Sequence, residues 1–271
     1  METLKILVPT DFSSTFKAAD AVVSLLQKKL NTQITLLHVI PVNGNILDEE
    51  AAENKVLTLI DEAKQKFKAL QLSWKFDYLL KKGAITSTIN EMAVELGVDV
   101  IIMGTKGSSG LMEHLVGSEA QHVARGAAVP IITVNQYSAP TKLQQVLLLL
   151  DFEKPSKHPQ LDFIHKIANQ DACINLLHIL KPNEINMVAD IEHNMREFAV
   201  INNLENYNIF LHSDDQVDEG VYNFNKDHEM DLVCIGTHGR KGFGHLLFGS
   251  VAERLINHCA KPVLTYHLNS L

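Results

Sequence analysis

The chain has 271 residues, a length that allows one large domain or two of medium size. Hydrophobic residues make up 46% of it and charged residues 21%, which is ordinary for a globular protein and argues against a disordered or low-complexity chain. The formal net charge of −8 argues against a general nucleic-acid-binding protein, because such a protein carries a basic face.

Neither a membrane span nor a secretion signal is expected. The longest purely aliphatic run, Val146 to Leu150, is far shorter than the roughly 20 residues that cross a bilayer. The first residues, METLKILVP, resemble a core strand more than the apolar segment of a signal peptide. The three cysteines lie in the second half without disulfide or metal-binding spacing, so the expected location is the reducing cytoplasm.

In chain order, the first half alternates apolar runs with segments of helical periodicity. An apolar run that ends at Asp11 predicts the first strand, and its continuous aliphatic character is typical of a strand buried on both faces. The further expected strands are 33–39, 74–80, 99–105 and 131–134, and the expected helices are 16–30, 48–70, 85–96 and 118–127.

The second half repeats this order. Asp11 and Asp151 lie 140 residues apart, and the same offset relates the Leu-Leu-His sequence at 36–38 to that at 176–178. Further along the chain, Gly104 and Gly236 lie 132 residues apart. The second copy is therefore eight residues shorter between its second strand and its Gly-Thr turn. Two constant offsets on either side of one deletion indicate a duplication.

The alternation of strands and helices favours parallel pairing, with helices on both faces of a sheet. The turn-rich segment 135–141 is the expected linker, so we expect two domains, residues 1–138 and 141–271.

A glycine pattern follows the fourth strand of each half. It consists of Gly104-Thr-Lys-Gly107, nine residues and Gly117-Ser118, and then of Gly236-Thr-His-Gly239, nine residues and Gly249-Ser250. Glycines let a ligand reach the backbone, and the free N–H groups at a helix start suit phosphate. Alternatively, the glycines merely shape a strand-to-helix connection. The P-loop pattern and GxGxxG are both absent, which weakens ordinary ATPase and dehydrogenase assignments.

Together with these loops, Pro9-Thr10-Asp11-Phe12-Ser13 and Leu36-Leu37-His38-Val39 resemble the pattern of the universal stress protein family. Both halves match the ATP-binding signature of that family, G-x2-G-x9-G-S/T. The resemblance covers nearly the whole chain. It implies an α/β fold of two tandem doubly wound domains, each with a five-stranded parallel sheet of the adenine-nucleotide alpha hydrolase-like, Rossmann-like type. The nucleotide would lie at the carboxyl ends of the strands.

The resemblance further implies that the chain imitates by itself the dimer that single-domain members of the family form. The last strands, 131–134 and 263–266, would then meet across a pseudo-twofold axis. A further dimer of two chains stays open.

The resemblance also implies one site per half for ATP or a related adenine nucleotide, with or without Mg²⁺. Asp11 and Val39 would contact the adenosine, and the glycine loop would surround the phosphates. The implied residues of the first half are Pro9, Thr10, Asp11, Val39, Met103, Gly104, Gly107, Gly117, Ser118, Glu119 and Ala120. Those of the second half are Asp151, Ile179, Ile235, Gly236, Gly239, Gly249, Ser250, Val251 and Ala252.

The two copies differ at these sites. The second half has Leu149-Leu150 in place of Pro9-Thr10 and lacks a counterpart of Gly83. Its loop adds His238, Arg240 and Lys241, and cations favour phosphate. We expect the first site to be slightly the better one, with both sites open.

Catalytic residues are not evident from the spacing, because no paired carboxylates, nucleophile with a base, or arginine finger can be recognised. The 13 histidines show no metal-binding spacing. We therefore expect a nucleotide-dependent regulator or binding module of the stress response, with an unknown protein partner, rather than an enzyme. Two alternatives remain: a weak ATPase or nucleotide-dependent transferase, and an interaction module with vestigial nucleotide sites.

Overall fold

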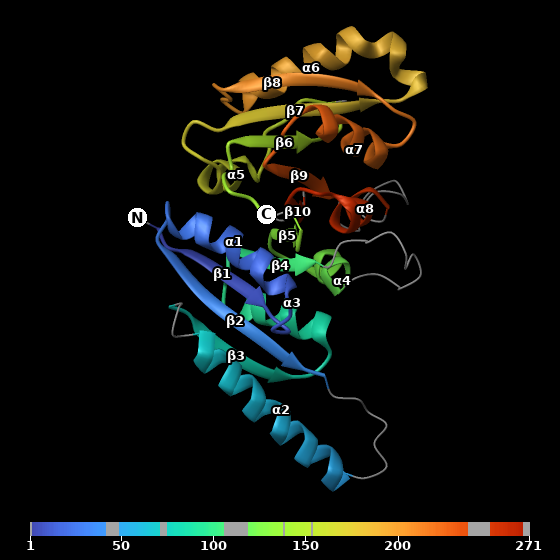
Figure 1. Cartoon of the computed structure of the whole chain (residues 1–271). Coiled ribbons are helices and arrows are strands. Elements are labelled where there is room, and N and C mark those ends of the chain that lie inside the picture. Colours follow the sequence, from blue (N-terminus) through green and yellow to red (C-terminus); the bar gives the residue numbers. More distant parts are fainter. Residues whose placement is uncertain are drawn as a thin grey trace.

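The computed structural model describes residues 2–41, 49–70, 75–105, 119–137, 139–152, 154–237 and 250–267. Strands and helices alternate along both halves (Figure 1). The first half contains β1 Leu4–Pro9, α1 Thr15–Gln27, β2 Thr32–Ile40, α2 Glu49–Leu70, β3 Asp77–Lys82, α3 Ile85–Glu95, β4 Val100–Thr105, α4 Glu119–Gly126 and β5 Ile131–Asn135. The second contains β6 Gln145–Leu149, α5 Leu161–Ile167, β7 Cys173–Leu180, η1 Pro182–Met187, α6 Val188–Ile201, β8 Tyr207–Ser213, α7 Val217–Asp227, β9 Leu232–Thr237, α8 Ser250–His258 and β10 Val263–His267.

All of these strands form one sheet, in the order β3-β2-β1-β4-β5-β10-β9-β6-β7-β8. Within each half the neighbouring strands are parallel. The chain moves outward in one direction from β1 to β3 and in the other from β4 to β5, so the strand order reverses between β1 and β4. This confirms the doubly wound α/β fold, and open sheets of this kind bind ligands outside the carboxyl ends of the strands where the order reverses.

Strands β5 and β10 join the two halves as an antiparallel pair. Ile132 lies opposite Leu264, which is its counterpart at the offset of 132. Thr133 lies opposite Val263, and Ile131 lies opposite Thr265, so the register is symmetric about the central pair. Equivalent residues that face one another lie on a local twofold axis, and the last strands therefore meet as the family resemblance implies.

Helices cover both faces of the sheet, which is why its strands alternate between two cores. Ile6 and Val8 point into a core that crosses both halves and includes residues of α1, α2, α5 and α6. Leu7 points to the other face, beneath α3 and α4, and the second half has a matching core beneath α7 and α8. The Lys29 ammonium links the halves by donating to the Ile167 carbonyl oxygen at 2.7 Å. None of the described helices combines the length and apolarity that crossing a bilayer requires.

The second copy is shorter between its second and third strands. Helix α2 of the first half has 22 residues, whereas the second half has the 3-10 helix η1 followed by α6 of 14 residues. In η1 the Glu184 carboxylate accepts the Lys181 backbone N–H at 2.8 Å. One expected boundary was wrong. The strand expected from residue 74 begins at Asp77, whose partner in β2 is Thr35, and residues 71–74 lie outside the described ranges.

A buried histidine lies between β6 and α5 of the second half. The backbone N–H of Gln160 donates to His158 Nδ1 at 3.3 Å, so the neutral ring carries its proton on Nε2, which lies 3.1 Å from Tyr266 Oη. Burial lowers the pKa of His158 to about 4. A protonated ring would also turn a second N–H against that of Gln160.

We expect this histidine to make the fold acid-sensitive. The unfolded chain binds a proton below about pH 6.5, whereas the folded chain does not until about pH 4, so stability is lost as the pH falls through this window. The full effect would be roughly 3 kcal/mol. Urea unfolding should show that His158→Gln flattens the pH dependence of the unfolding free energy between pH 6.5 and 4.5.

The matched control is His165→Gln, since His165 is an exposed histidine on the neighbouring helix α5. It should keep the slope of the unmodified chain. An unchanged slope in His158→Gln would show that other groups cause the acid sensitivity.

Candidate functional site

The carboxyl end of β1 is held in a defined turn where the strand order reverses. The Thr10 backbone N–H donates to the Leu37 carbonyl oxygen at 2.8 Å, which continues the pairing of β1 with β2. Thr10 Oγ1 accepts the Phe12 N–H at 2.9 Å, and Asp11 Oδ1 accepts the Ser13 N–H at 2.9 Å. These bonds fix the direction of an exposed carboxylate at the point where the strand order reverses, between β1 and β4.

Phe12 adopts a left-handed backbone conformation in this turn, with φ of 60°. This conformation is unusual for a bulky residue and costs on the order of 1–3 kcal/mol. The ring is held by two aromatic contacts, with centroid distances of 4.8 Å to His38 and 4.9 Å to Phe67 of α2. When packing keeps a residue in a strained backbone conformation at the end of a strand, the strain is a reason to suspect a functional site.

His38 ties β2 to the same turn. Its Nδ1 lies 2.7 Å from the Thr10 carbonyl oxygen, and because a carbonyl can only accept, Nδ1 carries the proton and donates it. The sequence predicts only that His38 fills a strand end. Its role in holding Thr10 depends on the tertiary structure, although the repeated Leu-Leu-His sequence marks the position.

The carboxyl end of β4 lies next to that of β1, because the two strands are parallel neighbours in the sheet. A Cβ on Gly104 would lie 1.9 Å from the Thr15 carbonyl oxygen, so the first turn of α1 packs on β4 because this residue has no side chain. The next residue, Thr105, is 4% exposed, and its hydroxyl has no hydrogen-bond partner among the described residues. It directly precedes residues 106–118.

The structure brings several residues of the predicted first site to this edge. Pro9, Thr10 and Asp11 form the end of β1 and its turn. Val39 and Met103 pack in one core cluster beneath α3 and α4, with 8% and 7% of their surfaces exposed. Glu119 and Ala120 begin α4, and Thr86 donates to the Glu119 carboxylate at 3.1 Å. The predicted loop residues lie outside the described ranges: Gly107, Gly117, Ser118, Gly239 and Gly249.

The corresponding edge of the second half is built differently. Asp151 follows β6, but Leu150 has no hydroxyl to hold the turn as Thr10 does. Phe152 is 1% exposed and packs edge-on against Phe198 at 5.4 Å, without the left-handed conformation of Phe12. The other predicted residues lie in β7 (Ile179), in β9 (Ile235, Gly236) and in the first turn of α8 (Ser250, Val251, Ala252).

His178, the counterpart of His38, has a different partner. Its Nε2 lies 3.4 Å from the Glu184 carboxylate, while its buried Nδ1 has no partner among the described residues. Burial acts to raise the pKa of Glu184, but the Lys181 N–H and His178 together lower it. His178 therefore holds η1 in the second half, whereas its counterpart His38 holds the strand end in the first half.

The first edge presents an oriented hydrogen-bond acceptor, because Asp11 can accept hydroxyl hydrogens of a ligand. Val39 and Met103, at the ends of the neighbouring strands β2 and β4, are buried in the core cluster. The second edge retains a carboxylate, but its backbone is not held in the same turn. Among the described residues, no group of three or more His, Cys, Asp or Glu side chains is placed to hold a metal ion.

Comparisons with known proteins agree with the duplication. The model of the universal stress protein family matches residues 2–135 and again residues 142–267. Universal stress protein MJ0577 of Methanocaldococcus jannaschii is 30% identical over 153 residues, covering 49% of this chain and 94% of the relative. Universal stress protein G of Shigella flexneri is 31% identical over 109 residues, covering 37% and 76%.

A solved structure supports the arrangement of the whole chain. The crystal structure of a universal stress protein from Archaeoglobus fulgidus superposes with a TM-score of 0.71, covering 98% of both chains. Its sequence is 17% identical, so this likeness concerns the fold. It extends over both halves together.

Gly104 provides a test of how the first edge is built. Gly104→Ala should lower the unfolding free energy by about 3 kcal/mol, because the methyl group would overlap backbone atoms of α1 that cannot move independently. The measurement is chemical denaturation.

Gly126→Ala is the matched control, since its added Cβ would meet only the end of the Asn90 side chain, and alanine favours a helix. Its effect should stay below about 1 kcal/mol. Equal losses in the two variants would contradict the packing role of Gly104.

Proposed function

Because the chain belongs to the universal stress protein family and contains two copies of its domain, we propose that it binds ATP or a related adenine nucleotide in the first half. The bound nucleotide would act on the conformation or the protein partners of a stress-response regulator. The observation that carries the proposal is the turn of Thr10, Asp11 and Phe12, which holds a carboxylate where the strand order reverses between β1 and β4.

The chemistry of this edge suits the adenosine part of a nucleotide. A carboxylate at the end of a strand in such sheets accepts hydrogen bonds from ribose hydroxyls. The Asp11 carboxylate is exposed, and the Ser13 N–H sets its direction before any ligand arrives. Val39 and Met103, at the ends of β2 and β4, are the nonpolar residues that would contact a flat base. The Thr105 hydroxyl adds a polar group that lacks a protein partner among the described residues.

The assignment of the phosphates stays a prediction from the sequence. Gly107, Gly117 and Ser118 would offer backbone N–H groups and a hydroxyl, and α4, which begins at Glu119, would direct the positive end of its dipole toward them. Regulation is favoured over turnover because Asp11 has a positioning role in the turn. No nucleophile and base pair is formed by the described residues of this edge.

The first half is the better candidate because three features of its turn are altered in the second. Leu150 replaces the Thr10 hydroxyl, Phe152 is folded into the core, and the counterpart of His38 bonds to Glu184. The turn after β6 therefore lacks the threonine hydroxyl and the left-handed phenylalanine that shape the turn after β1. This supports a single competent site per chain.

A pair of matched substitutions tests the proposal. Asp11→Asn should weaken the binding of ATP, ADP or AMP about tenfold to a hundredfold, because it removes charge-assisted hydrogen bonds to the ribose. Asp151→Asn should leave the affinity within about twofold of the unmodified chain. Isothermal titration calorimetry on nucleotide-stripped protein measures both.

Two outcomes would contradict the proposal. The first is that millimolar ATP, ADP and AMP neither release heat nor raise the melting temperature of the unmodified chain. The second is an equal loss of affinity in the two variants. ATP turnover that scales with protein and disappears in Asp11→Asn would favour the enzymatic alternative.

A further inference from the structure

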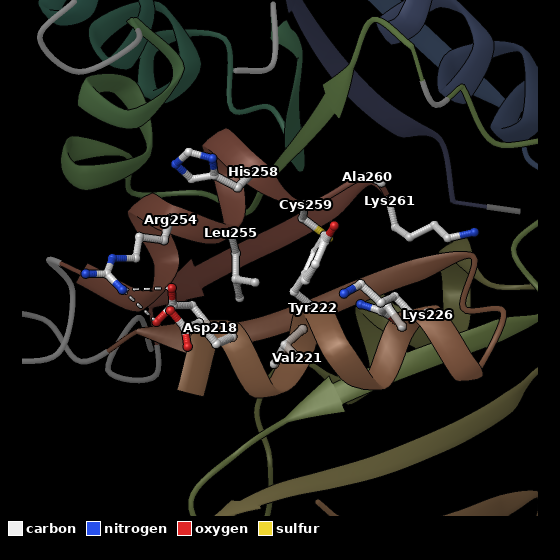
Figure 2. Close-up of a pocket in the computed structure, with 12 residues that line it drawn as sticks. Asp218, Val221, Tyr222, Lys226, Arg254, Leu255, His258, Cys259, Ala260 and Lys261 are labelled. Carbon is white, nitrogen blue, oxygen red and sulfur yellow. Dashed lines mark hydrogen bonds and ion pairs between the residues drawn. The ribbon is translucent and has the colours of Figure 1, made fainter. Parts of the chain in front are cut away.

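A groove of about 610 Å³ lies between α7 and α8 of the second half (Figure 2). Its volume falls within the range of small-molecule sites. The buried side chains of Val221, Leu255 and Cys259 form part of its lining. In Figure 2 the ring of Tyr222 extends from α7 toward Cys259, and the ion pair of Arg254 with Asp218 lies at one end.

The groove reflects a difference between the two copies. In the first half, Asn90 Nδ2 of α3 lies 3.4 Å from the Val123 carbonyl oxygen of α4 and 2.7 Å from the place of a Cβ on Gly126. In this half a small residue, Gly126, thus faces the end of the Asn90 side chain. At the offset of 132, Asn90 corresponds to Tyr222 and Gly126 to His258. These larger side chains prevent α7 and α8 from packing in the same way.

A polar side chain without partners lies in the same place. Asn225 lines the groove, and both its Nδ2 and its Oδ1 are buried without a hydrogen-bond partner among the described residues. Its counterpart in the first half is Ala93, a buried residue of the core. An unpaired buried amide is costly, whereas alanine would avoid that cost. A ligand that pairs with the amide accounts for asparagine at this position.

The charge and shape next to Asn225 indicate the kind of ligand. Lys226 Nζ lies 4.3 Å from the centroid of the Tyr222 ring, so a cation and a flat apolar surface stand side by side on α7. Tyr222 and Lys226 are exposed whereas the Asn225 amide is buried, so binding to the amide requires neighbouring side chains to move aside. Of the two lysines that line the groove, Lys226 and Lys261, Lys226 follows Asn225 directly on α7. A lysine beside one amide donor matches a carboxylate, while phosphate usually takes more donors. The Tyr222 ring and the aliphatic lining match an aromatic body.

We propose that this groove binds a small aromatic carboxylic acid. Its carboxylate accepts hydrogen bonds from Lys226 Nζ and Asn225 Nδ2, and its ring lies against Tyr222 above Val221 and Leu255. The site is separate from the proposed nucleotide site at the end of β1. Because α8 begins at Ser250, at the end of the second glycine pattern, the groove shares a helix with that loop.

Protein-observed NMR on the full chain tests the proposal, with 4-hydroxyphenylacetate and 4-hydroxybenzoate as probes. Both acids should cause saturable shifts of amide signals around Tyr222, Asn225 and His258. The uncharged alcohol 2-(4-hydroxyphenyl)ethanol should bind about tenfold more weakly, because it lacks the charge that Lys226 pairs with. Lys226→Gln should reduce the affinity for the acids by a similar factor, and Lys154→Gln, at an exposed lysine outside the groove, should not.

Asn225→Ala separates a binding role from a structural one. It should raise the melting temperature of the ligand-free chain, since it removes an unpaired amide, and it should also weaken both acids. A higher melting temperature with unchanged affinity would overturn the proposal. So would the absence of saturable shifts, equal binding of the alcohol, or shifts that gather around Asp11 at the first strand edge.

Discussion

Backbone pairing between β5 and β10 determines how the two halves of the chain lie relative to each other. Equivalent residues, Ile132 and Leu264, face each other in this pair, so the two halves share one sheet and one core that crosses between them. Side chains reinforce the junction on the other face, where Gln121 of α4 donates to the Glu253 carbonyl oxygen of α8 and Arg125 pairs with the Glu253 carboxylate. Helices α4 and α8, which follow the two glycine patterns, therefore touch each other.

Duplication explains why the halves could diverge without loss of the fold. The strands and the junction keep their apolar residues, because both faces of the sheet are buried. The strand ends and the surfaces between helices have changed instead. Phe12 and Phe152 take different backbone conformations, His38 and His178 bond to different elements, and the core residue Ala93 has become Asn225. The first half thus has the turn that orients the Asp11 carboxylate, and the second half has the groove between α7 and α8.

The fold could be predicted from the sequence because its signals are local. Apolar runs, helical periodicity and two constant offsets were enough for the order of elements, and the family resemblance added the meeting of the last strands. The geometry of the first site could not be predicted, because it depends on contacts between distant residues. The left-handed conformation of Phe12 requires packing by Phe67, and the hydrogen bond of His38 requires β2 beside β1. Gly104 was predicted as a ligand contact, and the structure gives it a packing role against Thr15. The unpaired amide of Asn225 could not be predicted either, because it becomes evident only from the burial of the side chain in the structure.

The central claim is that the fixed turn after β1 makes the first half the competent nucleotide site. Native mass spectrometry of the chain, equilibrated with adenine nucleotide and sprayed from a volatile buffer, reports how many nucleotides each chain carries. At a nucleotide concentration close to the dissociation constant, the account predicts at most one nucleotide per chain, with the same occupancy in the unmodified protein and in a variant with Asp151 replaced. It predicts a strongly reduced occupancy when Asp11 is replaced. Two nucleotides of equal occupancy, or an occupancy that is unchanged without the Asp11 carboxylate, would contradict it.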